Sequence, residues 1–318
     1  MGIGLLFPGQ ASQFPGMGKE LHDAYPVARE VFREASEALG FSLADLCFRG
    51  SEEDLRRTEN TQPSIFTVSV AAYRVLAEEA GIRPLCAAGH SLGEYSALVA
   101  AGALSLKDAV LLLRSRGKYM QEAVPLGEGA MAAVIGLSPE TVAAVCREAG
   151  REGVVEPANY NGGGQIVISG SAAAVAAACE AAKSAGAKMV MPLPVSAPFH
   201  CSLMEPAALR LAPELRAAKA GMFAFPVVAN VTAEAYPQGE GVAETLLRQI
   251  VSPVRWEEGV RRMRAMGVTS FLEVGPGKVL SGLVRRIERD LPVAAFCAPA
   301  DLSAVRGLAG RSFSLYGR

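Results

Sequence analysis

One serine stands where a nucleophile would be exposed. Ser91 lies in "GHSLG", which follows the short apolar run "LCAAG" and precedes a helical pattern that reaches Gly102. This is the G-x-S-x-G spacing, in which the flanking glycines allow a sharp turn from strand to helix with the serine at its apex. The backbone N–H of Leu92 is then free at the helix N-terminus, where an oxyanion would form. The alternative is an ordinary glycine–serine turn, because the motif alone is a weak match.

A serine hydroxyl needs a base, and the chain contains only three histidines. His22 lies in the polar segment "KELHDAYP", where we expect a solvated surface residue. His90 directly precedes Ser91, and adjacent side chains on a strand or sharp turn point in different directions. His200, in "VSAPFHCSLM", is the remaining candidate for the base, and a buried structural histidine is the alternative. No histidine follows His200, so we do not expect the Ser–Asp–His order of common lipases and esterases.

Arg116 is the cationic residue that could determine which acyl group binds. It lies in "LLLRSRGKYMQ", on the helix predicted to follow the Ser91 helix, where its guanidinium could bind a carboxylate through two hydrogen bonds. That position would indicate an acyl group with a second, free acid. Arg114 and Lys118 lie beside it, so a surface arginine is an equally good interpretation of the pattern.

Composition excludes several function classes. The chain has 318 residues, half of them apolar and a fifth charged, with a formal net charge of −1, which is typical of a globular protein with a large core. No Lys/Arg-rich run suggests nucleic acid as a partner. The six cysteines are far apart and form no C-x-x-C pair, so we expect buried thiols in a reducing compartment and no metal site. The apolar N-terminal run is too short for a signal peptide, and no uncharged span is long enough to cross a membrane, so we expect cytoplasmic localisation.

Strand and helix patterns alternate along most of the chain, which predicts an α/β fold with a parallel-rich sheet. The expected strands of this sheet cover residues 3–7, 85–89, 225–231 and 270–274. The expected helices cover residues 26–39, 63–80, 92–102, 105–123, 206–218, 241–250 and 256–266. Ser105 is the predicted N-cap of one of them, with Asp108 in its first turn.

A different pattern runs from Gly127. Residues 127–196 read strand, helix, strand, strand, helix, strand, which is the ferredoxin-like order, so we predict a subdomain inserted into a larger catalytic domain. The catalytic domain would then be discontinuous and comprise residues 1–126 and 197–300. The tail, residues 301–318, has no clear pattern, and we expect no regular element there.

Several ordered segments together identify a family: "FPGQASQ", "GHSLGEYSAL", "RGKYMQEA", "NYNGGGQIVISG", "PFHCSLM", "QIVSPVRW" and "EVGPGKVLSGL". In this order and spacing, they resemble the malonyl-CoA:acyl carrier protein transacylases of fatty acid synthesis, the family that also supplies the acyltransferase domains of polyketide synthases. The resemblance covers residues 3–300. It implies an α/β-hydrolase-like core with a ferredoxin-like insertion.

The resemblance also implies roles for three residues of a catalytic centre. Ser91 would carry the acyl group and His200 would be its base. Gln249 would orient His200 through its backbone carbonyl, in the place of a triad carboxylate. A carbonyl can fix the ring tautomer, although it stabilises an imidazolium less than an anion does.

Three further positions follow from the same resemblance. Gln10 would join the backbone N–H of Leu92 in the oxyanion hole, and Arg116 would pair with the free malonyl carboxylate. Ala11 departs from the family pattern, in which glycine is frequent here. A loop absorbs that change unless φ at the residue is positive.

The resemblance implies a ping-pong transfer of malonyl from coenzyme A to Ser91 and then to the phosphopantetheine thiol of acyl carrier protein. No cofactor is expected, since coenzyme A enters only as part of the substrate, and we expect a monomer. Ser–His chemistry does not itself choose between water and a thiol as acceptor, so a thioester hydrolase on this fold is an alternative. A carrier-protein docking module without activity is another, against which the intact site residues argue.

Overall fold

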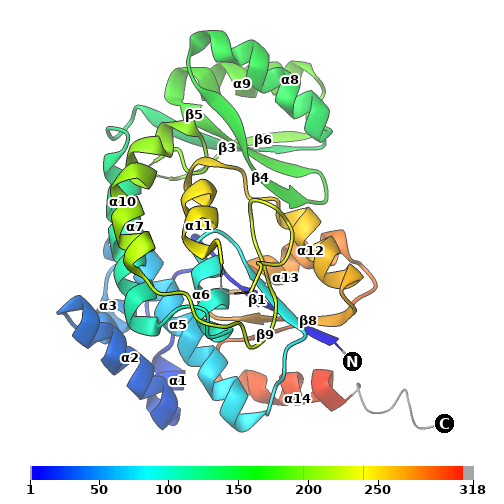
Figure 1. Ribbon diagram of the computed structural model, residues 1–318. Coiled ribbons are helices and arrows are strands. Elements are labelled where there is room, and N and C mark those ends of the chain that lie inside the picture. Colours follow the sequence, from blue (N-terminus) through cyan, green and yellow to red (C-terminus); the bar gives the residue numbers. More distant parts are fainter. Residues whose placement is uncertain (1, 196, 239, 311–318) are drawn as a thin grey trace.

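The computed structural model describes residues 2–195, 197–238 and 240–310. The chain forms two lobes (Figure 1). The large lobe contains a parallel sheet with helices around it, and the small lobe, at the top of the view, contains a separate antiparallel sheet. The predicted combination of a parallel α/β core with a second, antiparallel sheet is confirmed.

Within the described residues, the sheet of the large lobe has five strands, all in parallel pairs. In spatial order they are β7 (Val227–Val228), β2 (Cys86–Gly89), β1 (Gly2–Phe7), β8 (Val268–Val274) and β9 (Val293–Phe296). Along β1, Leu5 and Phe7 belong to one hydrophobic core and Leu6 to another. Apolar cores therefore cover both faces, as a parallel sheet requires.

The helices of the large lobe divide between the two sheet faces. Those before the small lobe are α1 (Lys19–Ala24), α2 (Pro26–Leu39), α3 (Leu43–Arg49), α4 (Glu52–Arg56), α5 (Thr58–Glu79), α6 (Gly93–Ala100) and α7 (Leu106–Glu122). Those after it are α10 (Glu205–Ala217), α11 (Val242–Val251), α12 (Trp256–Ala265), α13 (Val279–Ile287) and α14 (Leu302–Gly310). Trp256 and Val260 of α12 and Leu280 and Leu283 of α13 pack against the face that bears Leu6.

Two helical stretches differ from the prediction. Helix α5 begins at Thr58, before Pro63, which lies inside it. A proline cannot donate the hydrogen bond to the carbonyl four residues earlier. That carbonyl, of Glu59, instead accepts a hydrogen bond of 2.8 Å from Arg114 Nη1, so the helix continues through the proline.

The second difference is α14, because the expectation of no regular element after residue 300 is wrong. Val305 on this helix is fully buried in the main core, and Arg306 donates to the backbone carbonyl of Glu79 at 3.2 Å. Tertiary contact therefore stabilises a helix with a weak local pattern. Residues 311–318 lie outside the described residues.

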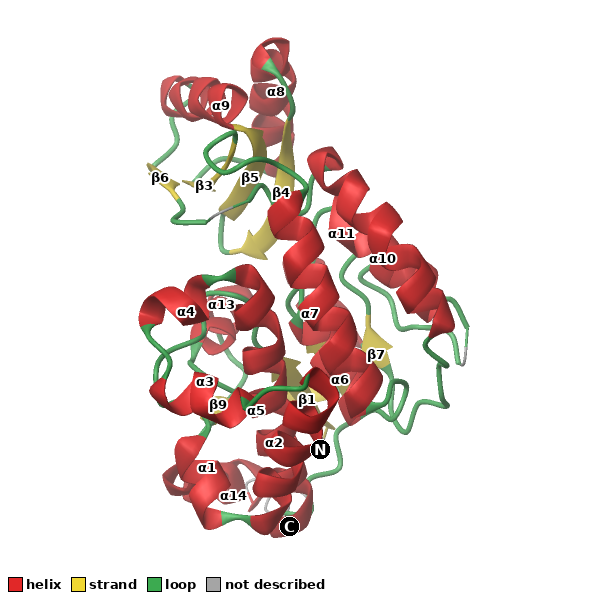
Figure 2. Cartoon of the chain, turned by 90° about the vertical axis from the view of Figure 1, so that its left-hand side faces the viewer, coloured by secondary structure: helices red, strands yellow, loops and turns green. Residues whose placement is uncertain are grey.

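The small lobe has the predicted strand and helix order. Its elements are β3 (Gly129–Ile135), α8 (Pro139–Ala149), β4 (Val155–Gly162), β5 (Gln165–Ser171), α9 (Ala172–Ser184) and β6 (Met189–Pro192). The sheet order is β4-β5-β3-β6 with antiparallel pairs, and α8 and α9 lie on one face (Figure 2). This is the ferredoxin-like arrangement. The domain boundaries at residues 126/127 and 196/197 stay predictions, and residue 196 is not described.

A hydrogen-bonded seam joins the lobes. Tyr160 N–H donates to the carbonyl of Val254, and Val254 N–H donates to the carbonyl of Ala158, each at 2.9 Å. Asn159, between them on β4, is paired in parallel with Val254. Backbone from the chain after α11 therefore extends the edge of the small sheet.

Two expectations from the sequence concern the cysteines, expected to be buried thiols, and the absence of a membrane-spanning segment. All six cysteines are free thiols, but only four are buried, since Cys179 and Cys297 are partly exposed. Among the helices of the described residues, none combines the length and apolar character needed to cross a membrane.

Candidate active site

Ser91 sits in a tight turn between β2 and α6. Its backbone φ is +53°, a left-handed conformation that is strained for a residue other than glycine. A Cβ on Gly89 would lie 1.9 Å from the backbone of Gly93, and a Cβ on Gly93 would lie 2.2 Å from the carbonyl oxygen of Phe7. Glycine is therefore required at both positions, and the turn is the nucleophile elbow that the spacing predicts.

His200 reaches Ser91 from the chain between β6 and α10. The distance between Ser91 Oγ and His200 Nε2 is 2.8 Å, and His200 Nδ1 lies 2.8 Å from the backbone carbonyl of Gln249 on α11. Because a carbonyl only accepts, Nδ1 carries the proton and Nε2 is free to accept from the serine hydroxyl. Burial and the nearby Arg116 cation lower the pKa of His200 to about 3, so the ring is neutral at physiological pH.

Arg116 lies on α7 and is 1% exposed. Its Nη1 donates to Gln62 Oε1 at 2.8 Å, and its Nη2 donates to Gln249 Oε1 at 2.9 Å and to Ser91 Oγ at 3.2 Å. Its Nε has no hydrogen-bond partner, and its hydrogen-bond partners within the described residues are two amides and the Ser91 hydroxyl rather than a carboxylate. Burial accordingly lowers the pKa of Arg116. The surface interpretation of Arg116 is wrong, and the site contains a buried cation with donors directed at the nucleophile.

The sheet explains why these groups meet. Gln10 follows β1 and Ser91 follows β2, and adjacent parallel strands bring their carboxyl ends to one edge of the sheet. A Cβ on Gly9 would lie 2.6 Å from the carbonyl oxygen of His90, so the two loops are in close contact. Leu92 N–H has no acceptor within the described chain, which leaves it available to an oxyanion. Ala11 in the first loop has a φ of +78°, so the departure from glycine there carries strain.

A cavity of about 150 Å³ opens at the nucleophile, between the lobes. The large lobe lines it with Gln10, Ala11, Gln62, His90, Ser91, Leu92, Arg116, Met120, Phe199 and His200. The small lobe and the chain that leaves it after β6 add Met131, Asn159, Leu193 and Val195. Wider surface hollows of about 570 and 580 Å³ lie at Cys146 and at Lys118, but neither is lined by Ser91 or His200. The small cavity is therefore the candidate acyl site.

Asn230 fixes the elbow and was not among the residues predicted from the sequence. Its Oδ1 accepts from the Ser91 N–H at 2.8 Å, and its Nδ2 donates to the Gly89 carbonyl at 2.7 Å. Asn230 lies two residues after the end of β7, the neighbour of β2, whereas the sequence pattern placed it inside the expected strand, so no local pattern marked it as part of the site.

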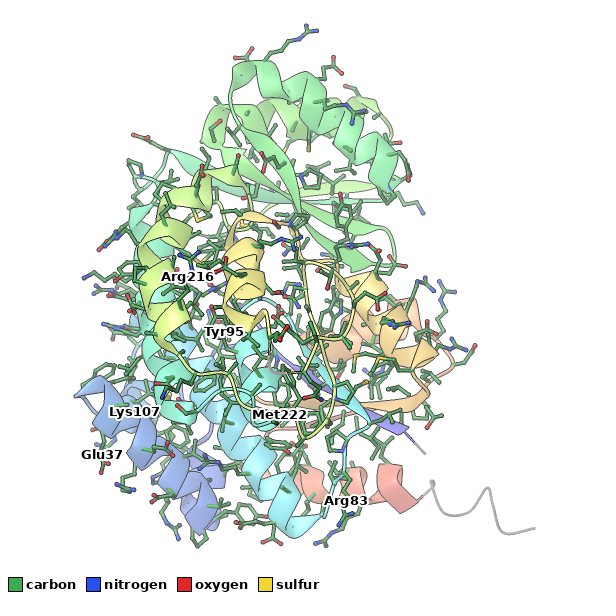
Figure 3. The ribbon with its side chains drawn as sticks, viewed as in Figure 1. Glu37, Arg83, Tyr95, Lys107, Arg216 and Met222 are labelled. Carbon is green, nitrogen blue, oxygen red and sulfur yellow. The ribbon has the colours of Figure 1, made fainter. Side chains whose placement is uncertain are left out.

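Glu94 and Gln62 were also not predicted from the sequence. Gln62, on α5, is the residue that accepts from Arg116 Nη1. Glu94 lies in the first turn of α6 and is fully buried, and Gln249 Nε2 donates to its Oε2 at 2.7 Å. Figure 3 shows the next residue, Tyr95, inside the large lobe, whereas Glu37 and Lys107 lie at its surface. An acid in the first turn of a helix is ordinary in sequence, so no local pattern marks Glu94 as part of the site.

The two other histidines do not contact Ser91 Oγ. His90 Nε2 lies 3.0 Å from Asn161 Oδ1, and its ring packs beside Trp256. His22 is partly exposed beside Asp23, as expected of a surface residue, but its ring also packs edge-on against Phe32 and Phe48. Within the described residues, no cluster of three or more His, Cys, Asp or Glu side chains could hold a metal ion.

The chain is similar to known proteins over almost its whole length. Residues 5–298 match the acyl transferase domain family. The chain is 50% identical over 301 residues to the malonyl CoA-acyl carrier protein transacylase of Bacillus subtilis, an alignment that covers 94% of this chain and 95% of that one. It is 48% identical over 299 residues to the protein of the same name from Escherichia coli K12, covering 94% and 97%.

Solved structures give the same result. The malonyl CoA-acyl carrier protein transacylase of Clostridium perfringens superposes with a TM-score of 0.96 at 40% identity, covering all of both chains. A malonyl-transacylase solved in complex with a type II polyketide synthase acyl-carrier protein gives 0.93 at 46% identity, covering 96% of this chain and 99% of that one. The match over nearly the whole chain and the shared fold confirm the resemblance seen in the sequence: the chain belongs to the acyl transferase domain family.

Proposed function

We propose that the protein transfers a malonyl group from malonyl-CoA to the phosphopantetheine thiol of acyl carrier protein, through a malonyl ester on Ser91. The observation that carries this proposal is the buried Arg116 guanidinium, which donates to Ser91 Oγ and has no carboxylate among its hydrogen-bond partners in the described chain. A malonyl thioester supplies both an electrophilic carbonyl for the serine and a free carboxylate for the arginine. The names of the relatives from Bacillus subtilis and Escherichia coli support the same substrates.

The first half-reaction places the acyl group on the enzyme. His200 Nε2 takes the hydroxyl proton as Ser91 Oγ attacks the thioester carbonyl. Gln10 and the N–H of Leu92 stabilise the oxyanion. The bond between carbon and sulfur then breaks, and His200 returns the proton to the sulfur of coenzyme A.

The second half-reaction runs the same steps with another thiol. The thiol of acyl carrier protein loses its proton to His200 and attacks the Ser91 ester, and the serine oxygen recovers the proton as it leaves. The backbone carbonyl of Gln249 keeps the imidazole in the required tautomer throughout.

Arg116 also links substrate choice to the base. Burial and the Arg116 charge keep the pKa of His200 low, so protonating His200 beside the free guanidinium is unfavourable. A malonyl carboxylate on Arg116 offsets that charge and makes His200 a better proton acceptor. An acetyl group has no carboxylate and cannot do this.

Mass spectrometry of the intact protein after mixing with malonyl-CoA tests the proposal. We expect one malonyl adduct, mapped to Ser91, that disappears when holo acyl carrier protein is added. Absence of the adduct would refute the proposal. Steady release of free malonate in the absence of carrier protein would instead identify a thioester hydrolase.

The remaining parts of the proposal concern partners and conditions. The proposed chemistry needs no metal and no cofactor, since coenzyme A serves only as the acyl donor. We propose a monomer that works in the cytoplasm, where malonyl-CoA and the carrier protein meet. Sedimentation equilibrium checks the monomer.

A further inference from the structure

A carboxylate that takes no part in the proposed acyl transfer lies under the active site. Glu94 is fully buried, and three donors converge on it. Tyr236 O–H donates to Oε1, while Oε2 accepts from Gln249 Nε2 at 2.7 Å and from Asn230 N–H at 3.2 Å. Three donors directed at the two oxygens of Glu94 favour its ionised form, because a carboxylate accepts hydrogen bonds and has no hydrogen to donate.

One amide group separates Glu94 from Arg116. Gln249 donates its Nε2 to Glu94 and accepts from Arg116 at its Oε1, so its side chain bridges the anion and the cation. The same Nε2 donates to the Ser91 carbonyl at 2.9 Å. Glu94 is thus connected to both the acyl-carrying residue and the cation that would hold the substrate carboxylate.

The titratable side chains near Glu94 and Arg116 come from several elements of the large lobe. Arg116 projects from α7, Tyr236 from the chain between β7 and α11, and Tyr95 is the next residue on α6. His200 approaches Arg116 from the chain before α10 and is neutral. Both tyrosines have raised pKa values because they are buried, so Glu94 and Arg116 are the two charges in this group.

Where Glu94 is ionised, the empty site holds one buried anion and one buried cation, with the Gln249 amide between them. A malonyl carboxylate on Arg116 adds a second anion to the same buried volume. Like charges in a buried site raise the pKa of a carboxyl group. Burial raises the pKa of Glu94 to about 7, so Glu94 is increasingly ionised above that pH in the empty site, and a further rise in its pKa makes it take up a proton there.

We propose, on the basis of the function proposed above, that Glu94 is the resident counter-charge of Arg116 and takes up a proton when a malonyl carboxylate occupies Arg116. The proton comes from solvent and adds to the Glu94 carboxylate. The acyl transfer itself stays balanced, because the Ser91 proton passes through His200 to the sulfur of coenzyme A. Glu94 is a positioning residue in this scheme, since it acts on the substrate through Gln249 and Arg116.

The sign of the pH dependence follows from linkage. A site that binds a proton together with malonyl binds malonyl better as pH falls. Acetyl places no charge on Arg116, so its reaction gives a reference with the same thiol leaving group. The ratio of kcat/KM for malonyl-CoA to that for acetyl-CoA should therefore rise as pH falls from 9 to 6, by about tenfold for each unit by which malonyl raises the pKa of Glu94.

The experiment measures single-turnover acylation of Ser91 by both thioesters from pH 6 to pH 9. We expect the rising ratio in the unmodified protein. In Glu94→Gln we expect a ratio that does not change with pH and stays near the pH 6 value of the unmodified protein. Tyr236→Phe removes a hydrogen bond that lowers the pKa of Glu94, so its transition should move to higher pH, and this variant decides the matter if Glu94→Gln does not fold.

Glu273→Gln is the matched control. Glu273 is also fully buried and accepts from the backbone N–H groups of Leu280 and Ser281, outside the active-site cavity. This variant should keep the pH profile of the unmodified protein. A ratio independent of pH in the unmodified protein, or a profile that persists in Glu94→Gln, overturns the inference. Loss of the malonyl adduct at Ser91 altogether refutes the proposed function instead.

Discussion

Replacing Arg116 with alanine separates substrate choice from general catalysis. If the guanidinium holds the malonyl carboxylate, Arg116→Ala leaves that anion buried without a partner, whereas an acetyl group loses nothing comparable. Removing one partner of a buried, hydrogen-bonded charge pair costs about 2–5 kcal/mol, or roughly 30-fold to 4,000-fold in kcat/KM.

The surrounding amides place the expected loss in the upper half of that range. Gln249 Oε1 and Gln62 Oε1 both point at Arg116, so in the variant they would face the malonyl carboxylate as acceptors. Gln249 cannot simply turn its amide over, because its Nε2 is held by Glu94 and by the Ser91 carbonyl. Water that fills the space of the lost side chain can recover only part of the interaction.

The assay compares kcat/KM for malonyl-CoA and acetyl-CoA in the unmodified protein, in Arg116→Ala and in Lys118→Ala. Lys118 lies on the same helix but is exposed, so its loss should leave the ratio unchanged. Because both substrates react at Ser91, a general loss of activity caused by damage to the elbow cancels in the malonyl-to-acetyl ratio. An unchanged malonyl-to-acetyl ratio in Arg116→Ala would show that acyl specificity lies elsewhere and that the reasoning is wrong.

Four other outcomes test the remaining parts of the site. Ser91→Ala should form no acyl-enzyme, because no other hydroxyl occupies the elbow; peptide mapping of an adduct on another residue would contradict this. His200→Ala should slow single-turnover acylation by about 10²–10⁴-fold. A collapse of the melting temperature with near-normal activity would instead indicate a structural histidine. Since the pKa of His200 is about 3, the ring stays neutral above that pH, and acylation by acetyl-CoA should keep its rate from pH 8 down to pH 5 in stopped-flow measurements. Ala11→Gly relieves about 1–2 kcal/mol of left-handed strain against about 0.4–1 kcal/mol of added chain entropy, so the free energy of unfolding should rise by up to about 1.6 kcal/mol in urea titrations, and a decrease would refute the strain argument.

Local sequence patterns were informative where local physics decides the structure. The elbow at Ser91 follows from two glycines that leave no room for a Cβ, and the N-cap of α7 follows from a Ser105 side chain that accepts from Asp108 N–H. The order of elements in the small lobe follows from periodicity. In each case, the residues that determine the conformation lie within a few positions of one another.

The remaining features depend on contacts between distant segments. Pattern alone left Arg116 undecided between surface and interior, because burial of α7 is set by its packing against α5, where a Cβ on Gly117 would lie 2.5 Å from the Thr58 carbonyl. Asn230 lies 139 positions from the Ser91 N–H that it accepts from. Helix α14 forms because Val305 is buried in a core built by earlier parts of the chain. None of these contacts leaves a local signature.

The seam between the lobes limits how the fold can be recombined. The small lobe is continuous in sequence from β3 to β6. This segment, the cassette, could therefore be exchanged between relatives in one piece to alter acyl selectivity. However, the edge of its sheet is completed by Val254, on the segment that directly follows α11, and α11 carries Gln249. A chimera cut only at the two ends of the cassette would pair a foreign β4 with the resident segment and shift the carbonyl that orients His200. Chimeras that also transfer α11 and the residues through Val254 should keep the seam and the catalytic geometry together.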